Sequence, residues 1–564
     1  MHRWAGSRSI GMDRNTLLAF FLIALVLLFT PKYMEIFYPP AEETVDSVPP
    51  SRNSKNPSEN LEKTNVKSKV LNTPSLPFSS ESGTIEKLST IETSLYKAVV
   101  SSRGGGTIKA FFVSNYLGSD SLPVNVVNEA LSYQNLLVSI KDLDGNPVDL
   151  SGPWLSKNTS SYQSIKNEET LEYSLEVAPG VFIKKSLVFK PDDYSILVKI
   201  HSEDIKNVIH RDMLFSWGGG LSSTEKDTKD DKTYFNSYVY QGGELEELKT
   251  KMGEEEKKSF NGETSWCAIR TKYFVAALIP ETPTDIRSAS LIGAGDSLET
   301  HKMSFVLDPH NQNSFVLYLG PLEYDRIKSL GAHVDEIMDF GWAFIRPISK
   351  GVLYALTRMH EHIPNYGFVL IVFSFLVKVL VFPLTKKSYQ STAAMQKIQP
   401  QVNSLREKYK NNPQKLNQAT MKLYKERGVN PLGGCLPMLL QMPLLFALFI
   451  VFRTTIELRN EPFVFWIKDL SSPDVIFSLP FSIPIYGSNV AFLPILMVIS
   501  TFIQQKMMSG GVQQPQQKMM QYFMTGFFFL IFNTFPSGLN LYYTLFNVLT
   551  IAQQKLIPGT QQST

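Results

Sequence analysis

The apolar positions of this chain fall into continuous runs and alternating runs, which predict different elements. Six continuous runs approach the length that a helix needs to cross a bilayer. These runs lie at residues 17–29, 367–383, 436–452, 491–503, 519–535 and 539–551. The pattern therefore predicts a polytopic α-helical membrane protein with six transmembrane helices.

The residues between the first and second runs change character twice. Residues 39–91 are rich in Pro, Ser, Glu and Lys and nearly free of aromatic side chains, which predicts a disordered tether. Residues 92–335 instead alternate between apolar and polar positions, with turn clusters between the runs. The clearest runs are 136–143, 181–189, 195–202 and 314–320. This region is predicted to form an all-β sandwich domain.

Residues 336–366 are predicted to form an amphipathic helix in the membrane interface, with Pro347 as a break. The apolar positions at helical spacing are Ile337, Phe340, Phe344 and Ile348. The second transmembrane helix is expected at residues 367–385, and residues 431–564 are expected to hold transmembrane helices three to six and a short tail.

Residues 386–430 carry apolar positions that step by three and four, which is the seam of a coiled coil. The first arm of this seam consists of Met395, Ile398, Val402, Leu405 and Tyr409. A second arm repeats the spacing with Leu416, Ala419 and Leu423 after the turn NNP, and Gly428 is placed to cap it. The segment therefore predicts a helical hairpin.

Charge placement gives the topology of the chain. The hairpin segment holds ten Lys and Arg residues against two Glu residues, and positive loops stay in the cytoplasm. Six spans then put both termini in the cytoplasm and the β domain outside. The excess charge either only sets this topology or docks the hairpin to ribosomal RNA or anionic lipid. The lysines considered for docking are Lys408, Lys410, Lys415, Lys422 and Lys425.

The amino terminus, residues 1–38, places Arg3, Arg8 and Arg14 before the first apolar run. A secretory signal peptide shares this arrangement, but no small-x-small cleavage site follows, so a retained membrane anchor is favoured. Met12 is an alternative start of the chain. The two cysteines, Cys267 and Cys435, are far apart and indicate neither a metal site nor a disulfide framework.

One lysine, Lys378, lies inside the second apolar run, about 10 Å below its cytoplasmic end on a helix. An ammonium in lipid costs at least ~2.5 kcal/mol, so this charge is expected to face water held between helices. Ser374 shares its face one turn earlier. Polar positions in other spans are the expected partners, either as interhelical contacts or as the lining of a groove. They are Thr501, Gln504, Asn540, Tyr543, Thr544 and Asn547.

The six runs contain no Asp, Glu or His, although a proton or ion pump normally carries such residues in its spans. No glycine-rich phosphate loop of the Walker type occurs either. We expect no nucleotide or other cofactor, and we do not expect the protein to be an enzyme. An unpaired lysine in a polar setting suits a translocating polypeptide with acidic and polar residues.

At these residues the sequence closely resembles the YidC family of membrane protein insertases, in its Gram-negative form with a large periplasmic domain. The motifs that carry the resemblance are VFPLTKKSYQSTAAMQKIQP (381–400), LYKERGVNPLGGCLPMLLQMPLLFALF (423–449), ELRNEPFVFWIKDL (457–470) and FPSGLNLYY (535–543). The β domain contributes only RGG at residues 103–105 and YLGP at 318–321.

The resemblance implies a five-helix insertase core with an N-terminal anchor, located in the bacterial inner membrane. It implies a hydrophilic groove that passes the polar part of nascent membrane proteins while their apolar segment leaves sideways into membrane lipids. It also implies that the protein acts alone or beside the Sec translocon, and that the hairpin is required for insertion. Family members typically have arginine where this chain has Lys378, and Ser374 and Tyr543 match groove positions.

Other classes of protein remain as alternatives. A small-solute secondary transporter would carry internal repeats, which the spans lack. A simple tether for the β domain would need one span and no buried lysine. The β region also suits a carbohydrate-binding or sugar-isomerising sandwich, but His210, His301 and His310 are scattered and form no site.

Overall fold

The computed structural model describes residues 85–118, 120–158, 160–202, 205, 208–209, 211–249, 254–294, 297–429, 436–483, 486–509 and 515–556. All of them belong to the second of two compact units, which begins at Pro77. The predicted anchor and most of the predicted tether lie outside these residues. The tether boundary at residue 91 needs correction, because β1 (Leu88–Glu92) already pairs in a sheet and buries Ile91.

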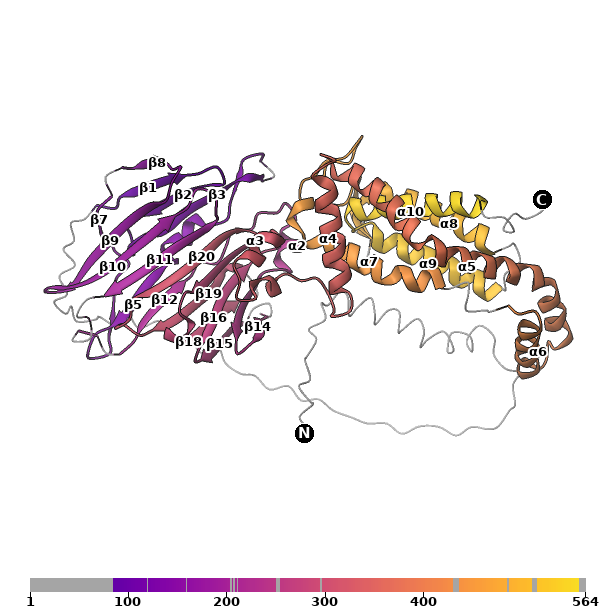
Figure 1. The fold of residues 1–564 in the computed structure, drawn as a ribbon, viewed down its shortest axis with the longest axis horizontal. Helices are drawn as coiled ribbons and strands as arrows, with labels where there is room; N and C mark the ends of the chain where they lie inside the picture. The colour runs from indigo at the N-terminus through magenta and orange to yellow at the C-terminus, as the bar shows by residue number, and fades with distance from the viewer. Residues whose placement is uncertain are drawn as a thin grey trace, which may run out of the picture. The chain divides into compact units, whose positions relative to one another are not determined.

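Three sheets make up the β domain (Figure 1). The five-stranded sheet has the order β4 (Pro123–Asn125), β3 (Thr107–Leu117), β2 (Tyr96–Ser101), β1, β8 (Tyr162–Ser164). The nine-stranded sheet has the order β14 (Glu244–Leu248), β13 (Asn236–Gln241), β16 (Thr264–Arg270), β17 (Phe274–Pro280), β20 (Asn313–Pro321), β11 (Ser195–Ser202), β10 (Val181–Phe189), β9 (Glu169–Ala178), β7 (Leu155–Ser156). The six-stranded sheet has the order β15 (Glu255–Asn261), β18 (Ile286–Ala294), β19 (Ser297–Leu307), β12 (Met213–Trp217), β5 (Leu137–Lys141), β6 (Pro147–Val148).

The nine-stranded and six-stranded sheets pack face to face, as a sandwich requires. The ring of Phe315 on β20 lies 4.9 Å from that of Phe215 on β12 and 5.4 Å from that of Phe305 on β19. Strands β10 and β11 coincide with the predicted runs 181–189 and 195–202 and pair antiparallel. The prediction of a β-sheet domain is confirmed.

The strand β10 shows how the alternating pattern builds the core, and where it is broken. Ile183, Leu187 and Phe189 are buried, and so is Lys185, which occupies an apolar position of the alternation. The amine of Lys185 donates hydrogen bonds to the carbonyl oxygens of Gly104 and Leu136. Burial lowers the pKa of Lys185 to about 7. A neutral amine has two N–H donors, which matches these two acceptors.

The RGG motif forms the tight turn before β3. Gly105 has a φ of +70°, and a Cβ at this position would lie 2.4 Å from the Trp154 ring. Only glycine supplies both the backbone conformation and the space. The motif is thus explained by packing in the β domain.

Short helices lie between the strands and after them. These short elements are η1 (Glu129–Gln134), α2 (Thr228–Lys232), η3 (Pro283–Asp285), α3 (Tyr324–Ser329) and η4 (Val334–Ile337).

The predicted interfacial helix is shorter than expected. The prediction of a single helix over residues 336–366 is wrong, because the helix α4 spans Arg346–His360. Pro347 lies in its first turn, where a missing N–H costs nothing, so this proline begins the helix and does not break it.

The helix α5 (Tyr366–Lys408) is 43 residues long and joins two predicted elements. Asn365 caps its first turn by accepting hydrogen bonds from the N–H groups of Gly367 and Phe368. The predicted boundary between the second span and the hairpin at residues 385 and 386 is wrong, since the helix runs through Pro383 and Pro400. Among the described residues, α5 is the one helix long and apolar enough to cross a membrane by length and composition.

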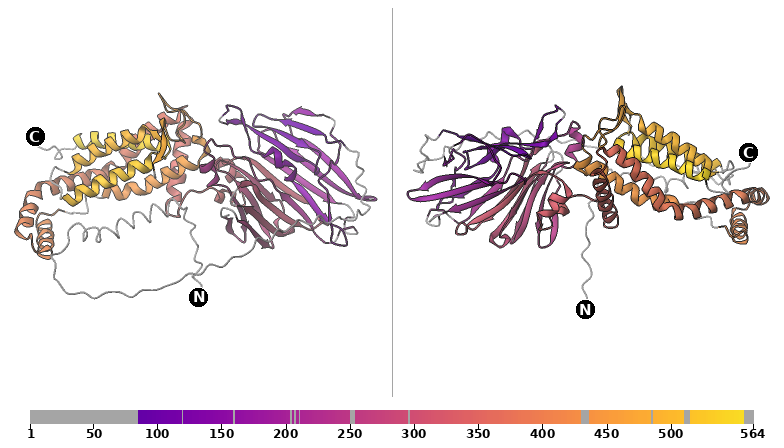
Figure 2. Two further views of the ribbon diagram at one scale, coloured as in Figure 1. Left: turned by 180° about the vertical axis from the view of Figure 1, so that it is seen from behind. Right: turned by 45° about the horizontal axis from the view of Figure 1, so that its top comes forward.

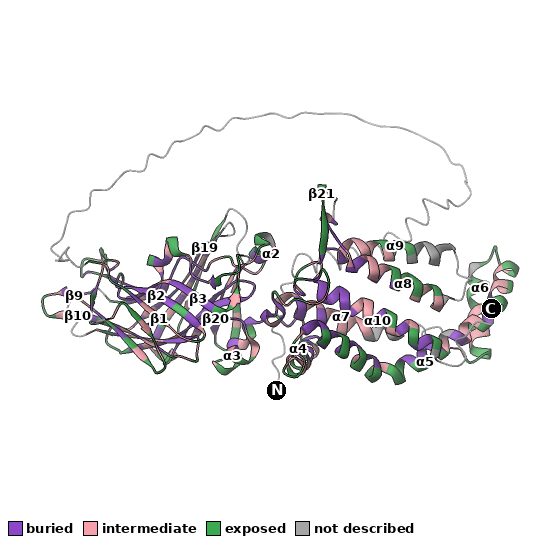
Figure 3. Cartoon of the chain, turned by 90° about the horizontal axis from the view of Figure 1, so that it is seen from above, coloured by how far each residue is buried: buried purple, intermediate pink, exposed green. Residues whose placement is uncertain are grey.

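Four further helices follow the predicted apolar runs with shifted ends, namely α7 (Leu436–Thr454), α8 (Leu493–Ser509), α9 (Pro515–Phe532) and α10 (Ser537–Leu556). The helix α6 (Pro413–Glu426) is the second arm of the hairpin, and η6 (Ile456–Leu458) is a short turn after α7. The helix α10 packs against both α5 and α8. Figure 2 shows these helices from two further sides, and Figure 3 shows α10 between α8 and α5. Close packing at the start of α10 requires Gly538, since a Cβ there would lie 2.3 Å from the Phe452 ring.

A two-stranded sheet between α7 and α8 was not predicted. Strand β21 (Val475–Ile483) pairs antiparallel with β22 (Gly487–Ala491). In Figure 3 the strand β21 is coloured as exposed along most of its length.

Candidate functional site

The candidate site is built around Lys378, which α5 carries among the helices α5, α8 and α10. Its side chain is 6% exposed, and its ammonium donates a hydrogen bond to the Thr550 hydroxyl on α10 at 2.6 Å. The ammonium also lies 4.1 Å from the centroid of the Phe546 ring. Among the described residues, no carboxylate forms an ion pair with it. A hydroxyl dipole and an aromatic face thus stabilise this cation without neutralising it.

Ser374 lies one helical turn before Lys378 on the same face of α5, as predicted. It is fully buried, and its hydroxyl donates to the carbonyl oxygen of Leu370 in its own helix at 2.7 Å. This bond occupies the hydroxyl proton and leaves oxygen lone pairs that can accept.

Asn547 on α10 connects the site to α8. Its amide nitrogen donates to the Thr501 hydroxyl at 2.8 Å and to the Ser500 hydroxyl at 3.2 Å. Gln504, one turn further along α8, is half-buried. The predicted residues Thr501 and Asn547 are therefore in direct contact, and α10 links the polar residues of α5 to those of α8.

The other predicted residues of α10 have different surroundings. Asn540 is fully buried and donates to the carbonyl oxygens of Phe532 and Phe535, so it ties the turn between α9 and α10. Thr544 donates to the Asn540 carbonyl at 2.8 Å. The hydroxyl of Tyr543 is buried and has no hydrogen-bond partner in the described part of the chain.

Three residues of the site were missed from the sequence: Thr550, Phe546 and Ser500. Thr550 lies three residues after Asn547 and seven after Tyr543, so the same helical spacing could have found it. Phe546 and Ser500 give no such signal, because their contacts depend on how the helices pack.

The helical hairpin, formed by the end of α5 and by α6, carries the predicted seam. Ile398 and Val402 are buried, whereas Met395, Leu405 and Tyr409 are half-buried. The helix α6 folds back beside the end of α5, with Gly428 at a φ of +62° as its left-handed cap (Figure 1). The five lysines considered for docking are all exposed, namely Lys408, Lys410, Lys415, Lys422 and Lys425.

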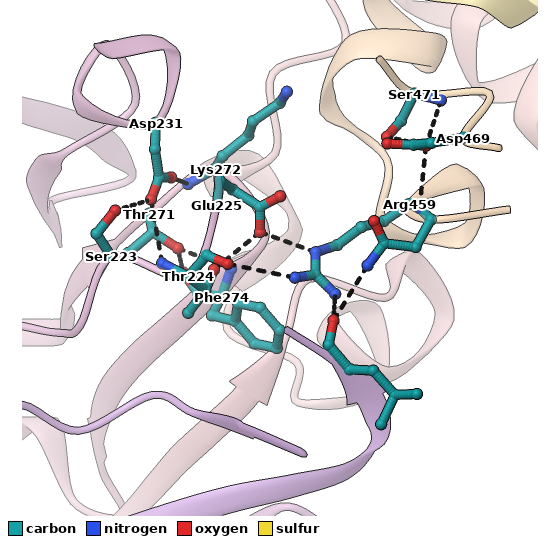
Figure 4. Close-up of polar contacts among 12 residues, drawn as sticks. Ser223, Thr224, Glu225, Asp231, Thr271, Lys272, Phe274, Arg459, Asp469 and Ser471 are labelled. Carbon is teal, nitrogen blue, oxygen red and sulfur yellow. Dashed lines mark hydrogen bonds and ion pairs between the residues drawn. The ribbon is translucent and has the colours of Figure 1, made fainter. Parts of the chain in front are cut away.

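The segment after α7, which carries the motif ELRNEPFVFWIKDL, contacts the β domain through Arg459. Its guanidinium donates to the Glu225 carboxylate at 2.8 Å and to the Leu117 carbonyl oxygen at 2.9 Å (Figure 4). The Arg459 side chain is 2% exposed and faces the rings of Tyr273 and Phe274, both 5.8 Å away. This motif is therefore a connection to the β domain and not part of the site around Lys378.

A second charged contact involves Arg453 at the end of α7. Its guanidinium lies 2.7 Å from one oxygen of Asp230, while the ammonium of Lys272 lies 2.8 Å from the other. Burial would raise the pKa of Asp230, but Lys272 and Arg453 hold that pKa below its usual value. We call Glu225, Asp230, Lys272, Arg453 and Arg459 the junction cluster.

Among the described residues, no group of three or more His, Cys, Asp or Glu side chains could hold a metal. His301 is buried, and its ring nitrogen pairs with the Ser237 hydroxyl at 2.7 Å inside the β domain. Cys267 is also buried in this domain. Neither belongs to a site with the chemistry of catalysis.

A β-sheet domain joined to a helical core with a buried cation defines a membrane protein with a polar interior and an extramembrane domain. Comparison with known proteins gives the same class. Residues 88–351 match the family model described as the YidC periplasmic domain, and residues 358–563 match the 60Kd inner membrane protein family.

Full-length relatives identify the family. The chain is 36% identical to the membrane protein insertase YidC of Chlorobium luteolum, with 98% of this chain and 96% of that protein covered. It is 34% identical to the YidC of Chloroherpeton thalassium, over 98% and 97% of the two chains. The chain belongs to the YidC family of membrane protein insertases. It is an inner membrane protein with a periplasmic domain and a helical insertase core. The prediction of an insertase is confirmed, and the alternative of a small-solute transporter is not.

Solved structures give weaker similarities. A crystal structure titled as an active YidC insertase with the first transmembrane domain resolved has a TM-score of 0.36 and 18% identity, covering 84% of this chain and 95% of its own. A putative mutarotase from Salmonella typhimurium has a TM-score of 0.26 and 6% identity, covering 41% of this chain and 90% of its own. Similarities at this level give no support to a sugar site.

Proposed function

We propose that this insertase moves the polar part of a nascent membrane protein through a hydrophilic groove lined by α5, α8 and α10. The observation that carries the proposal is the buried ammonium of Lys378, whose hydrogen bond goes to a neutral hydroxyl. A buried charge is costly unless polar groups or water solvate it. Lys378, Ser374, Tyr543, Thr501, Gln504, Asn547 and Thr544 would line the groove, with Asn540 holding its outer end together.

The unpartnered hydroxyl of Tyr543 supports the same proposal. Buried polar atoms nearly always have a hydrogen-bond partner, from the protein or from ordered water. Asn540 Oδ1 is also buried without a partner among the described residues. A helical interior with spare donors and acceptors lowers the cost of bringing a substrate's polar residues into the bilayer. Lateral release would follow, driven by ~0.8 kcal/mol for each substrate CH₂ group that enters lipid.

The proposed topology has six spans with both termini in the cytoplasm. It is supported by the apolar runs that become α5, α7, α8, α9 and α10, and by the run at residues 17–29. The basic hairpin lies between the spans α5 and α7, on the side that the positive-inside rule assigns to the cytoplasm. Exposed lysines on the hairpin suit contact with the ribosome or anionic lipid, and action beside the Sec translocon is a further part of the proposal.

Photocrosslinking during insertion tests the groove. A photoreactive phenylalanine analogue at Tyr543 should crosslink to the polar flank of a ribosome-bound membrane protein. The matched control is the same analogue at Val548, which lies on α10 but is 51% exposed. Equal crosslinking from both positions would contradict the groove, since it would place the substrate around the helix and not inside the bundle.

A further inference from the structure

The hairpin formed by β21 and β22 exposes an apolar stripe that the insertase site does not use. Five apolar side chains of β21 are exposed, namely Val475 (42%), Ile476 (47%), Phe477 (53%), Phe481 (61%) and Ile483 (36%). Neighbouring side chains of a strand point to opposite faces, so Phe481 and Ile483 share a face that Ser482 does not. The pairing with β22 is irregular between Ser478 and Ile483. The strand β21 is therefore mostly apolar and is uncovered along most of its length.

The base of the hairpin is held in place by buried polar contacts. Asn533, at the end of α9, accepts from the Ala491 N–H at 3.0 Å and donates to the carbonyl oxygens of Tyr486 and Asn489. Asp474, the residue before β21, accepts from the Leu493 N–H at 2.8 Å, where α8 begins. The start of β21, the turn residue Tyr486 and the strand β22 are therefore held at the ends of apolar helices, and β21 itself is the exposed part of the hairpin.

The base also lies beside aromatic residues of the kind found at membrane interfaces. Trp466 donates to Asp474 at 2.9 Å and packs edge-on against Phe492 at 4.8 Å. Phe465, the preceding residue, is 91% exposed. Tryptophan is enriched where a bilayer meets water. These aromatic residues precede the hairpin in the segment after α7, which also carries the β-domain contact of Arg459.

The absence of charge favours lipid over a protein partner. Residues 475–505 contain no Asp, Glu, Lys or Arg. A protein interface normally has a polar rim with directed hydrogen bonds, whereas an apolar face beside an aromatic belt suits the headgroup and acyl boundary. The outer edges of a two-stranded sheet carry unpaired N–H and C=O groups, which excludes the hydrocarbon core. Pro480 removes one such donor from β21.

We propose that the β21–β22 hairpin is a membrane-contact element, which lays its apolar face on the outer surface of the phospholipid bilayer beside the insertase core. Phe477, Phe481 and Ile483 enter the acyl boundary, while Ser478 and Ser482 face the headgroups and water. The hairpin thereby covers the lipid surface next to the periplasmic ends of α7, α8 and α9.

Depth-dependent quenching in the full-length protein tests this proposal. A cysteine at Phe481 is labelled with an environment-sensitive fluorophore, with Cys267 and Cys435 replaced by alanine, and the protein is placed in phosphatidylethanolamine and phosphatidylglycerol vesicles. Ser482→Cys is the matched control, adjacent in sequence but on the other face. The proposal places Phe481 ~5–10 Å deep in the interface. Lipids that carry a quencher near the top of the acyl chain should therefore quench the label at position 481 about threefold more strongly than the label at position 482. Aqueous iodide should show the reverse preference.

Two results would overturn the proposal. The first is equal iodide quenching at both positions without lipid quenching, which would leave the face in water. The second is protection of the label at position 481 from iodide in detergent micelles, together with a crosslink from this position to another protein or to a second copy of the chain. That result would make the exposed surface of β21 a protein interface. Gel filtration and an unchanged insertion rate of each labelled protein would show that the fold is intact.

Discussion

The ammonium of Lys378 donates to the hydroxyl of Thr550 at 2.6 Å, across 172 positions of the chain. The two residues join α5 to α10 inside the helical core. Because the acceptor is a neutral hydroxyl, and no carboxylate among the described residues pairs with Lys378, the positive charge is not cancelled by an ion pair.

The first prediction concerns the sign of this charge. Lys378→Arg should insert substrates at a rate close to that of the unchanged protein, because a point charge in the groove does not need a particular geometry. Lys378→Glu should lower the rate about tenfold or more, since tenfold corresponds to ~1.4 kcal/mol. Insertion into proteoliposomes measures both. Full activity of Lys378→Glu and Lys378→Met across several substrates would show that the charge has no role.

The second prediction concerns Thr550. Thr550→Val keeps the volume but removes the acceptor of the Lys378 hydrogen bond, and bonds to charged groups contribute ~1.5–3 kcal/mol. We expect a lower midpoint of thermal unfolding for the purified protein. Thr550→Ser retains the hydroxyl and should lose much less stability. A valine variant as stable as the serine variant would mean that Lys378 finds another acceptor.

The third prediction concerns the junction cluster. Arg459→Met should destabilise the protein by ~3 kcal/mol, because it leaves the carboxylate of Glu225 without its buried partner. The double variant with Glu225→Gln should lose less than the sum of the two single variants, which a double-mutant cycle measures. The pair of Arg287 and Asp212 is the control, since both side chains are more than 40% exposed. Its disruption should cost ~0–1 kcal/mol, and equal costs for the two pairs would contradict the role of burial.

The fourth prediction is a pH dependence from Lys185. Its pKa is about 7 in the folded protein and has the ordinary value of 10.5 in the unfolded chain. Between these values the unfolded chain binds a proton that the folded protein does not, so the free energy of unfolding rises with pH. Below pH 7 both states are protonated and this gain is absent.

Denaturant unfolding between pH 7 and pH 9 measures the effect of Lys185. Lys185→Met should reduce the rise in stability with pH, by up to ~1.4 kcal/mol per pH unit. Lys184→Met, on the exposed face of the same strand, should leave the slope unchanged. If Lys185→Met kept the full slope, another group would be responsible.

The fifth prediction concerns the five exposed lysines of the cytoplasmic hairpin. Their replacement by glutamine should weaken ribosome binding and flatten its dependence on salt, because fewer counterions are released. Sedimentation of detergent-solubilised protein with ribosomes at several salt concentrations measures this. Glutamine at Lys157, Lys190 and Lys249 of the β domain is the control. Unchanged affinity and salt slope in the hairpin variant would leave the lysines with a role in topology alone.

The sequence by itself determined the elements whose signal is local. The alternation of 181–189 and 195–202 determined β10 and β11, because the period of two follows from the geometry of a strand. The seam of Ile398 and Val402 and the cap at Gly428 determined the helical hairpin. The motifs after Val381 determined the family, and the buried position of Lys378 followed from an apolar run of helical length.

Only the tertiary structure decided which side chains meet. The bond from Lys378 to Thr550 and the contact of Arg459 with Glu225 depend on packing between distant segments, which no local pattern encodes. The helix α5 continues through Pro383, although a proline inside a helix removes one backbone hydrogen bond, and so the predicted boundary failed. The β21–β22 hairpin was missed since its apolar strand lies beside an apolar helix, and hydrophobicity alone does not separate them. The hydrogen bonds of Asn533 to Ala491 and Tyr486 hold the hairpin apart from the start of α8, and these bonds exist only in the folded chain.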